Sequence, residues 1–275
     1  MYLVSNRNDV DARLRPQLRV LLFGEALVTY PEEGFDDVPI PARCMLLLAY
    51  LMLHPKTRSR ERIAAALWPD IRDSEARANL RRVLHELVRI LPPSAEPWIV
   101  VDSQRIFWNP RASLWCDVEA FERLARDERT RAAAVDVYAG DLLAGEDAEW
   151  IVTLRMAFRE RQLEALGLLA DACLSRGDLS GAASAYRRLL DIDPFREDAF
   201  RSLLAVRLAR GDRARAVSEY ICFAMKLSAE LGVEPMPETI ACYEGVLRGG
   251  SPAREPAHAL PSRTALRHVA GILAT

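Results

Sequence analysis

The stretch SEARANLRRVLHELVRIL at residues 74–91 decides how the first part of the chain folds. Its leucines recur at helical spacing: Leu80, Leu84, Leu87 and Leu91. The other positions include the polar and basic residues Arg77, Asn79, Arg81, Arg82, His85 and Arg89. An apolar stripe of this period buries one face of a helix and leaves the opposite face in solvent. The sequence therefore predicts an amphipathic helix that ends before Pro92 and carries arginines on its outer face.

Two helices are expected before this stretch, and each has a clear stop signal. The first runs from about Ala42 to Leu53 and is closed by His54-Pro55, because the residue before a proline avoids the helical conformation. The second is capped by Ser59 and ends at Trp68-Pro69. With residues 74–91, these segments make three consecutive helices.

Segments rich in β-forming residues flank the three helices. LRVLLFGEALVTY at residues 18–30 predicts one or two strands that meet near Gly24. WIVV at 98–101, the polar turn DSQR at 102–105 and IFW at 106–108 have the pattern of a hairpin. This order of elements predicts an α/β winged helix-turn-helix, in which residues 74–91 form the recognition helix and the hairpin is the wing.

Positive charge is concentrated around the second and third helices. From Lys56 to Arg89 the chain has nine Lys and Arg against five Asp and Glu, although the net charge of the whole chain is −2. Arginine and asparagine read base edges, and cationic side chains contact phosphates. The candidate DNA-binding residues are Arg77, Asn79, Arg81, Arg82, His85 and Arg89 on the third helix, Thr57, Arg58, Ser59 and Arg60 before the second helix, and Arg105 in the wing. Two alternatives stay open. In the first, the third helix is a solvated charged helix that binds nothing. In the second, residues 57–60 only cap the second helix.

The second part of the chain contains a repeat. From about Cys116 onward, long helical patterns alternate with short breaks, and four residue types recur after 34 positions. The pairs are Gly177 and Gly211, Asp178 and Asp212, Ala182 and Ala216, and Tyr186 and Tyr220. A period of 34 residues is typical of the tetratricopeptide repeat. The fold class expected for the whole chain is therefore mainly α, with the winged helix-turn-helix followed by an all-α tetratricopeptide-like domain.

Several other classes of protein fit the sequence poorly. The longest apolar run, Cys44 to Leu53, is half the length of a membrane-spanning helix, and the polar start of the chain is unlike a signal peptide. Five scattered cysteines form no Cys-x-x-Cys pair. The phosphate-binding, nucleophile-elbow and zinc-protease motifs are absent from the sequence. We therefore expect a cytoplasmic protein with no catalytic site, no metal and no cofactor.

The expected domain organisation has four parts. Residues 1–16 form a disordered arm, 17–112 the winged-helix domain, 113–248 the helical repeat domain, and 249–275 a flexible tail. The tail begins with Gly-Gly-Ser-Pro, which is typical of a linker.

Specific stretches of the sequence resemble one family. In the first domain they are LRVLLFGEALV (18–28), LLLAYLMLHP (46–55), SRERIAAALWPD (59–70) and ARANLRRVLHEL (76–87). In the second they are DVEAFERL (117–124), YAGDLLAG (138–145), RGDLSGAASAYRRLLDIDP (176–194) and ELGVEPMPET (230–239). Together they resemble the SARP-type regulators of antibiotic pathways, which join an OmpR-like winged helix to a bacterial transcriptional activator domain.

This resemblance implies a transcriptional activator and its partners. Similar proteins bind promoter direct repeats near the −35 element as a homodimer or as side-by-side protomers, recruit RNA polymerase through its σ factor, and often control secondary-metabolite clusters. By position, the resemblance places Arg77, Asn79, Arg81, Arg82 and His85 in the DNA-facing helix, and residues 57–60 near phosphates. One departure is that family wings often carry glycine, whereas this wing reads VDSQRIFW.

Two other functions remain as alternatives. The first is a tetratricopeptide-type adaptor whose winged helix does not bind DNA. The second is an enzyme that uses the acidic residues between helices, such as Asp141 and Glu146. The basic third helix argues against the first alternative, and the missing catalytic constellation argues against the second.

Overall fold

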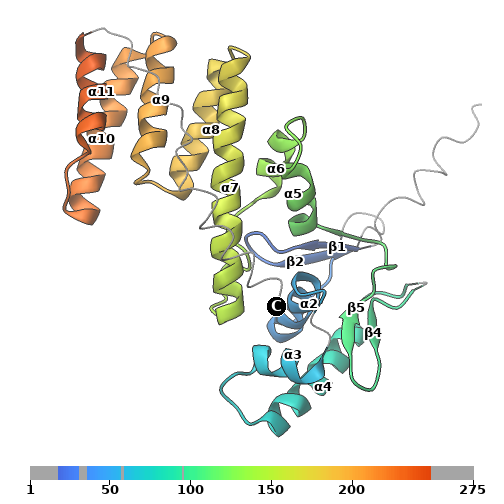
Figure 1. Ribbon diagram of the computed structural model, residues 1–275. Coiled ribbons are helices and arrows are strands. Elements are labelled where there is room, and N and C mark those ends of the chain that lie inside the picture. Colours follow the sequence, from blue (N-terminus) through green and yellow to red (C-terminus); the bar gives the residue numbers. More distant parts are fainter. Residues whose placement is uncertain (1–17, 31–35, 57–58, 95, 249–275) are drawn as a thin grey trace, which may run out of the picture. The chain divides into compact units, whose positions relative to one another are not determined.

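The computed structural model describes residues 18–30, 36–56, 59–94 and 96–248. The predicted arm at 1–16, the predicted tail at 249–275, and the candidate contacts Thr57 and Arg58 lie outside these ranges. The chain is mainly helical, with a small strand region near the N-terminus (Figure 1). It divides into two compact units, residues 1–158 and 159–275, and each is considered by itself.

A four-stranded sheet opens the first unit. Its strands, in the order β3-β2-β1-β6, are Asp36–Asp37, Leu27–Tyr30, Leu18–Leu21 and Leu114–Cys116. β1 and β2 are antiparallel and are separated by a turn that contains Gly24, whose φ of 82° favours glycine. The prediction of one or two strands that meet near Gly24 is thus confirmed, and the structure has two. The parallel pairing of β6 with β1 was not predicted. β6 has only three residues and lies far from β1 in the sequence, so no periodic pattern and no tight turn indicates the pairing.

The three helices and the hairpin lie where the sequence predicts them. The helices are α2 (Ala42–Leu53), α3 (Arg60–Leu67) and α4 (Asp73–Ile90), and the hairpin strands are β4 (Ile99–Val101) and β5 (Ile106–Trp108). Ser59 caps α3 by accepting a hydrogen bond from the backbone N–H of Arg62. The four predicted core leucines of residues 74–91 are all buried. α3 and α4 pack side by side, and β5 contacts α2 (Figure 1).

A buried carboxylate joins the first strand to the segment that follows the sheet. Asp117 begins α5 (Asp117–Ala125), is 1% exposed, and accepts hydrogen bonds from the backbone N–H groups of Leu22, Phe23 and Val118 at 2.8–2.9 Å. Burial raises the pKa of this carboxyl, although the backbone hydrogen bonds act in the opposite direction. The start of the predicted second domain therefore packs on the first strand.

Aromatic packing extends this connection. Phe23 makes an edge-on contact with Phe121 at 5.6 Å and with Phe158 at 5.5 Å, and it lies 4.6 Å from the Tyr138 ring. Helix α6 (Arg131–Val137) packs against α5. The compact first unit thus ends at Phe158, within α7 (Glu149–Ser175). The domain boundary that the sequence predicts between residues 112 and 113 is a different division of the chain and stays a prediction.

The second unit repeats one local geometry. After the end of α7 it contains α8 (Leu179–Ile192), α9 (Glu197–Ala209), α10 (Arg213–Leu231) and α11 (Pro237–Arg248). Gly177 and Gly211 have φ values of 75° and 78°, and the next N–H in each case donates to a carbonyl five residues back, at 2.8 and 2.9 Å. Ala182 and Ala216 are both fully buried. The sequence repeat is therefore also a repeat of turn conformation.

The environments of the cysteines predict their order of reactivity. All five are free thiols, but Cys44 and Cys116 are buried, and burial raises their pKa to about 11 and about 12. Cys222 is exposed. Because the thiolate is the reacting form, we expect a thiol reagent at neutral pH to label Cys222 well before Cys44 or Cys116, which react only when the chain unfolds. Mass spectrometry of peptides from briefly labelled protein measures this order, and early labelling of Cys116 would contradict it.

Candidate nucleic-acid interface

The outer face of α4 carries the predicted basic residues. Arg77, Arg81, Arg82, His85 and Arg89 are exposed, and Asn79 is half-buried. They surround the helix on the sides left free by its buried stripe of Ala76, Leu80, Val83, Leu84 and Leu87. Within the described part of the chain, no hydrogen bond or ion pair holds the Arg81 guanidinium. Arg82 Nη2 donates to Asn79 Oδ1 at 3.4 Å, so these two members of the set are hydrogen-bonded to each other along the helix.

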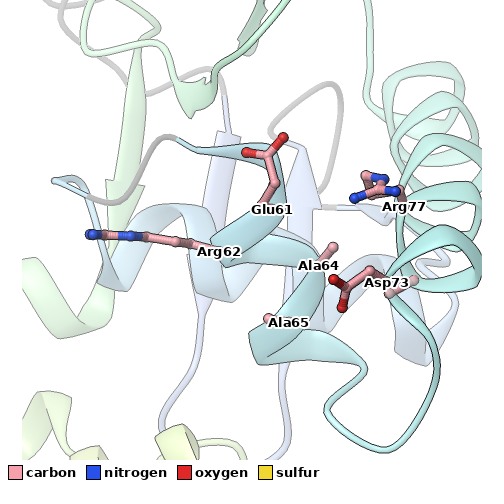
Figure 2. Close-up of a pocket in the computed structure, with 7 residues that line it drawn as sticks. Glu61, Arg62, Ala64, Ala65, Asp73 and Arg77 are labelled. Atoms are coloured by element: carbon pink, nitrogen blue, oxygen red, sulfur yellow. The ribbon is translucent and has the colours of Figure 1, made fainter.

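A hollow separates the first turns of α3 and α4 (Figure 2). Alanines line it together with charged side chains of both signs: Glu61, Arg62, Ala64, Ala65, Asp73, Ala76 and Arg77. Figure 2 shows Arg62 extending away from Arg77. The Ser59 hydroxyl donates to Glu61 Oε2 at 2.7 Å, and this hydrogen bond lowers the pKa of the Glu61 carboxyl. The mixed charge and small apolar floor describe the seam between two packed helices rather than a binding pocket for an ion of one sign.

Arg60 has a protein partner at the start of α3. Its Nη2 donates to the backbone carbonyl of Asp102, at 2.8 Å, and its N–H donates to the carbonyl of Gln104, at 3.2 Å. The sequence reasoning assigned Arg60 to phosphate and did not foresee these contacts. Ser59 and Arg60 are both half-buried, so the start of α3 rests against the β4–β5 turn.

Asp102 shapes this turn in the absence of glycine. Its Oδ1 accepts hydrogen bonds from the N–H groups of Gln104, at 2.9 Å, and Arg105, at 2.6 Å. Its Oδ2 accepts from Arg105 Nε at 2.8 Å. These donors, with Gln104 first, lower the pKa of Asp102. An aspartate that caps the N–H groups two and three residues later is a common turn former, which explains how the wing sequence dispenses with glycine.

The fold brings together residues that lie far apart in the sequence. Ser59 and Arg105 form an isolated antiparallel bridge, so the start of α3 and the tip of the hairpin are adjacent. Asp102 was missed by the sequence reasoning, because an acidic residue is not expected among phosphate-binding groups. The Asp-Ser-Gln-Arg pattern is the signal that would have indicated its capping role.

Among the residues that the structure describes, no cluster of three or more His, Cys, Asp or Glu side chains is arranged to hold a metal ion. No helix in the same ranges combines the length and hydropathy needed to cross a membrane.

Comparison with known proteins places the second half of the chain in a family. Residues 116–247 match the bacterial transcriptional activator domain. The chain is 28% identical over 239 residues to regulatory protein AfsR of Streptomyces coelicolor, covering 82% of this chain and 24% of the relative. It is 28% identical over 234 residues to AfsR of Streptomyces griseus, covering 79% and 24%. The chain therefore spans about a quarter of the length of these curated relatives.

A solved structure shares the fold. The match is Mycobacterium tuberculosis EmbR in complex with a low affinity phosphopeptide, with a TM-score of 0.64 and 20% identity over 94% of this chain and 71% of that chain. Residues 116–247 therefore belong to the bacterial transcriptional activator domain family, and most of the chain is similar in sequence to the regulatory protein AfsR.

Proposed function

We propose that this protein is a SARP-type transcriptional regulator, a sequence-specific DNA-binding activator whose N-terminal part, residues 17–112, is a winged helix-turn-helix. The observation that carries the proposal is the exposed basic face of α4, which follows α3 directly and stands on a buried leucine stripe. In helix-turn-helix proteins the second of two such helices enters the major groove. The β4–β5 hairpin is then the wing.

The exposed side chains of α4 suit two kinds of contact. Arg81 and His85 lie one turn apart on the outer face, with Arg82 beside them, and we assign these three to base edges. Arginine binds guanine through two parallel hydrogen bonds. Arg77, Asn79 and Arg89 flank them and suit the groove walls and phosphates. Thr57, Arg58 and Ser59 precede the N-terminus of α3, where a phosphate is favoured.

The second part of the proposal concerns promoter context. Similarity to AfsR supports binding to direct repeats near the −35 element by side-by-side protomers that recruit RNA polymerase through its σ factor. It also supports control of a secondary-metabolite or other specialised gene cluster from the bacterial cytoplasm. The 34-residue repeat of turn geometry supports a tetratricopeptide-like fold for residues 159–248. The EmbR structure contains a phosphopeptide, but the chain covers 71% of that protein, so peptide binding is not part of the proposal.

Replacing Arg81 by alanine tests the DNA contact. With a duplex that the full-length wild-type chain selects from a random pool, we expect R81A to lose about 1–3 kcal/mol of binding free energy and to relax the preference at one base pair. Wild-type affinity should fall steeply as salt rises, because phosphate contacts release counterions. Fluorescence anisotropy measures both effects.

The control is Arg129→Ala, which removes another exposed arginine, from the segment between α5 and α6. It should change affinity little. Wild-type binding that is insensitive to salt, together with an R81A variant that binds as tightly as wild type, would favour the adaptor alternative over DNA binding.

A further inference from the structure

The tip of the hairpin and the start of α3 are tied together by five residues, which we call the wing–α3 junction: Ser59, Arg60, Asp102, Gln104 and Arg105. Two links come from Arg60, whose guanidinium and N–H each donate to a carbonyl of the turn. A third is the backbone bridge between Ser59 and Arg105. Three candidate DNA contacts, which the sequence places in two distant segments, therefore form one continuous edge.

Asp102 takes part in nearly every bond that shapes this edge. Its carboxylate accepts three hydrogen bonds from Gln104 and Arg105, its carbonyl accepts from Arg60, and its N–H donates to the Arg105 carbonyl at 3.0 Å. The Asp102 side chain is only partly buried, since 36% of its surface is accessible. A negative charge at this position opposes phosphate binding. Any contribution of Asp102 to DNA binding must therefore come from the hydrogen bonds that its carboxylate accepts.

The bond to Arg105 leaves that side chain able to contact DNA. It uses Nε, at 2.8 Å, whereas a guanidinium has further donors on its two terminal amino groups. The ion pair therefore fixes the direction of Arg105 without using up its donors. Arg60 differs, because its terminal nitrogen is already directed to the turn.

We propose that Asp102 is a positioning residue for DNA binding: it orients Arg105 toward the phosphate backbone and, with Arg60, holds the wing against the start of α3. This inference rests on the proposed function. In this proposal Arg60 links the start of α3 to the wing and does not contact a phosphate. The wing and the α3 N-terminus then engage adjacent phosphates as one rigid surface, and α4 keeps the task of reading bases.

A role of Asp102 through its charge and a role in positioning Arg105 predict opposite changes in DNA affinity when Asp102 is replaced. If the residue acts only through its charge, its removal lessens repulsion and DNA binding becomes tighter. If it positions Arg105 and the wing, its removal weakens binding and lowers the salt dependence, because a phosphate contact is lost. The sequence preference set by α4 stays the same, since base contacts and phosphate contacts are made by different side chains.

The experiment compares full-length wild type with Asp102→Ala and Asp102→Asn on two probes, the duplex selected by wild type and a random-sequence duplex. We expect D102A to weaken binding to both probes about 5- to 30-fold and to reduce the salt slope by about one, without change in the selected sequence. D102N should be intermediate, because asparagine still accepts the two backbone hydrogen bonds but loses the ion pair.

Two controls separate positioning from charge and from misfolding. Asp70→Asn removes an exposed acid in the turn between α3 and α4 and should leave binding unchanged or slightly tighter. The stacked pair Trp98 and Trp108, with ring centroids 5.8 Å apart, lies on the hairpin and reports its integrity by near-ultraviolet circular dichroism. In a double-mutant cycle, D102A should have little further effect in an R105A background.

The possible outcomes either support or overturn the positioning role of Asp102. Weakened binding by D102A and D102N, with a native tryptophan signal in D102N and a strong coupling to Arg105, supports the inference. Equal or tighter binding by both variants, or an undiminished effect of D102A in the R105A background, overturns it and leaves the proposed function standing. Wild-type protein that shows no salt-dependent binding to either probe overturns both.

Discussion

Replacing Asp117 by alanine is expected to destabilise residues 18–158 by at least about 3 kcal/mol, because three backbone N–H groups lose their acceptor. Each unsatisfied buried donor costs about 1–3 kcal/mol, and water has little access to a site that is 1% exposed. Asp117→Asn should also be strongly destabilising. Both carboxylate oxygens accept N–H groups, so the amide nitrogen of asparagine would face a donor at either position.

Tryptophan fluorescence during urea unfolding measures this effect selectively. All five tryptophans lie between residues 68 and 150, within the first unit. The matched control is Glu119→Ala, which removes an exposed acid from the same first turn of α5 and should cost at most about 1 kcal/mol. Equal unfolding midpoints for D117A and E119A would show that the buried carboxylate does not hold the first strand.

Replacing Arg207 by alanine should have the largest effect in the second unit. This side chain is 2% exposed and donates through Nε and Nη2 to Glu219, at 3.1 and 2.8 Å, while Nη1 lies 3.7 Å from Asp212. Removing the buried Arg207 side chain opens a cavity and takes away the two-point partner of Glu219, which is 23% exposed and keeps one contact to Arg215. We expect a loss of about 3–5 kcal/mol.

The same glutamate supplies the control. Arg215 also pairs with Glu219, at 3.1 Å, but its side chain is 58% exposed, so R215A should cost less than about 1 kcal/mol. The double variant R207M/E219L should recover much of the loss, because it removes both charges and keeps apolar volume. The helical signal at 222 nm reports both units, whereas the tryptophans lie in the first unit only, so R207A should shift the part of the 222 nm transition that tryptophan fluorescence does not share. A midpoint for R207A that matches R215A would contradict this account.

The helices and the hairpin could be predicted because their signals are local. The leucine spacing of residues 74–91, the prolines after Leu53 and Trp68, and the turn DSQR each act within a few residues. The same spacing placed Arg81 and His85 on the outside of α4, where the structure has them. Recurrence after 34 residues likewise predicted matching turns at Gly177 and Gly211.

By itself, then, the sequence determined which segments are helices, which side of α4 is buried, and where the turn geometry repeats, since period and capping depend on neighbours in the chain. Tertiary structure alone decided that Asp117 would bind the end of the first strand, that Arg60 would face the hairpin turn, and that the buried Arg207 would pair with Glu219. Such contacts arise when packing excludes water and leaves a polar group one partner to satisfy it, and no local pattern names that partner.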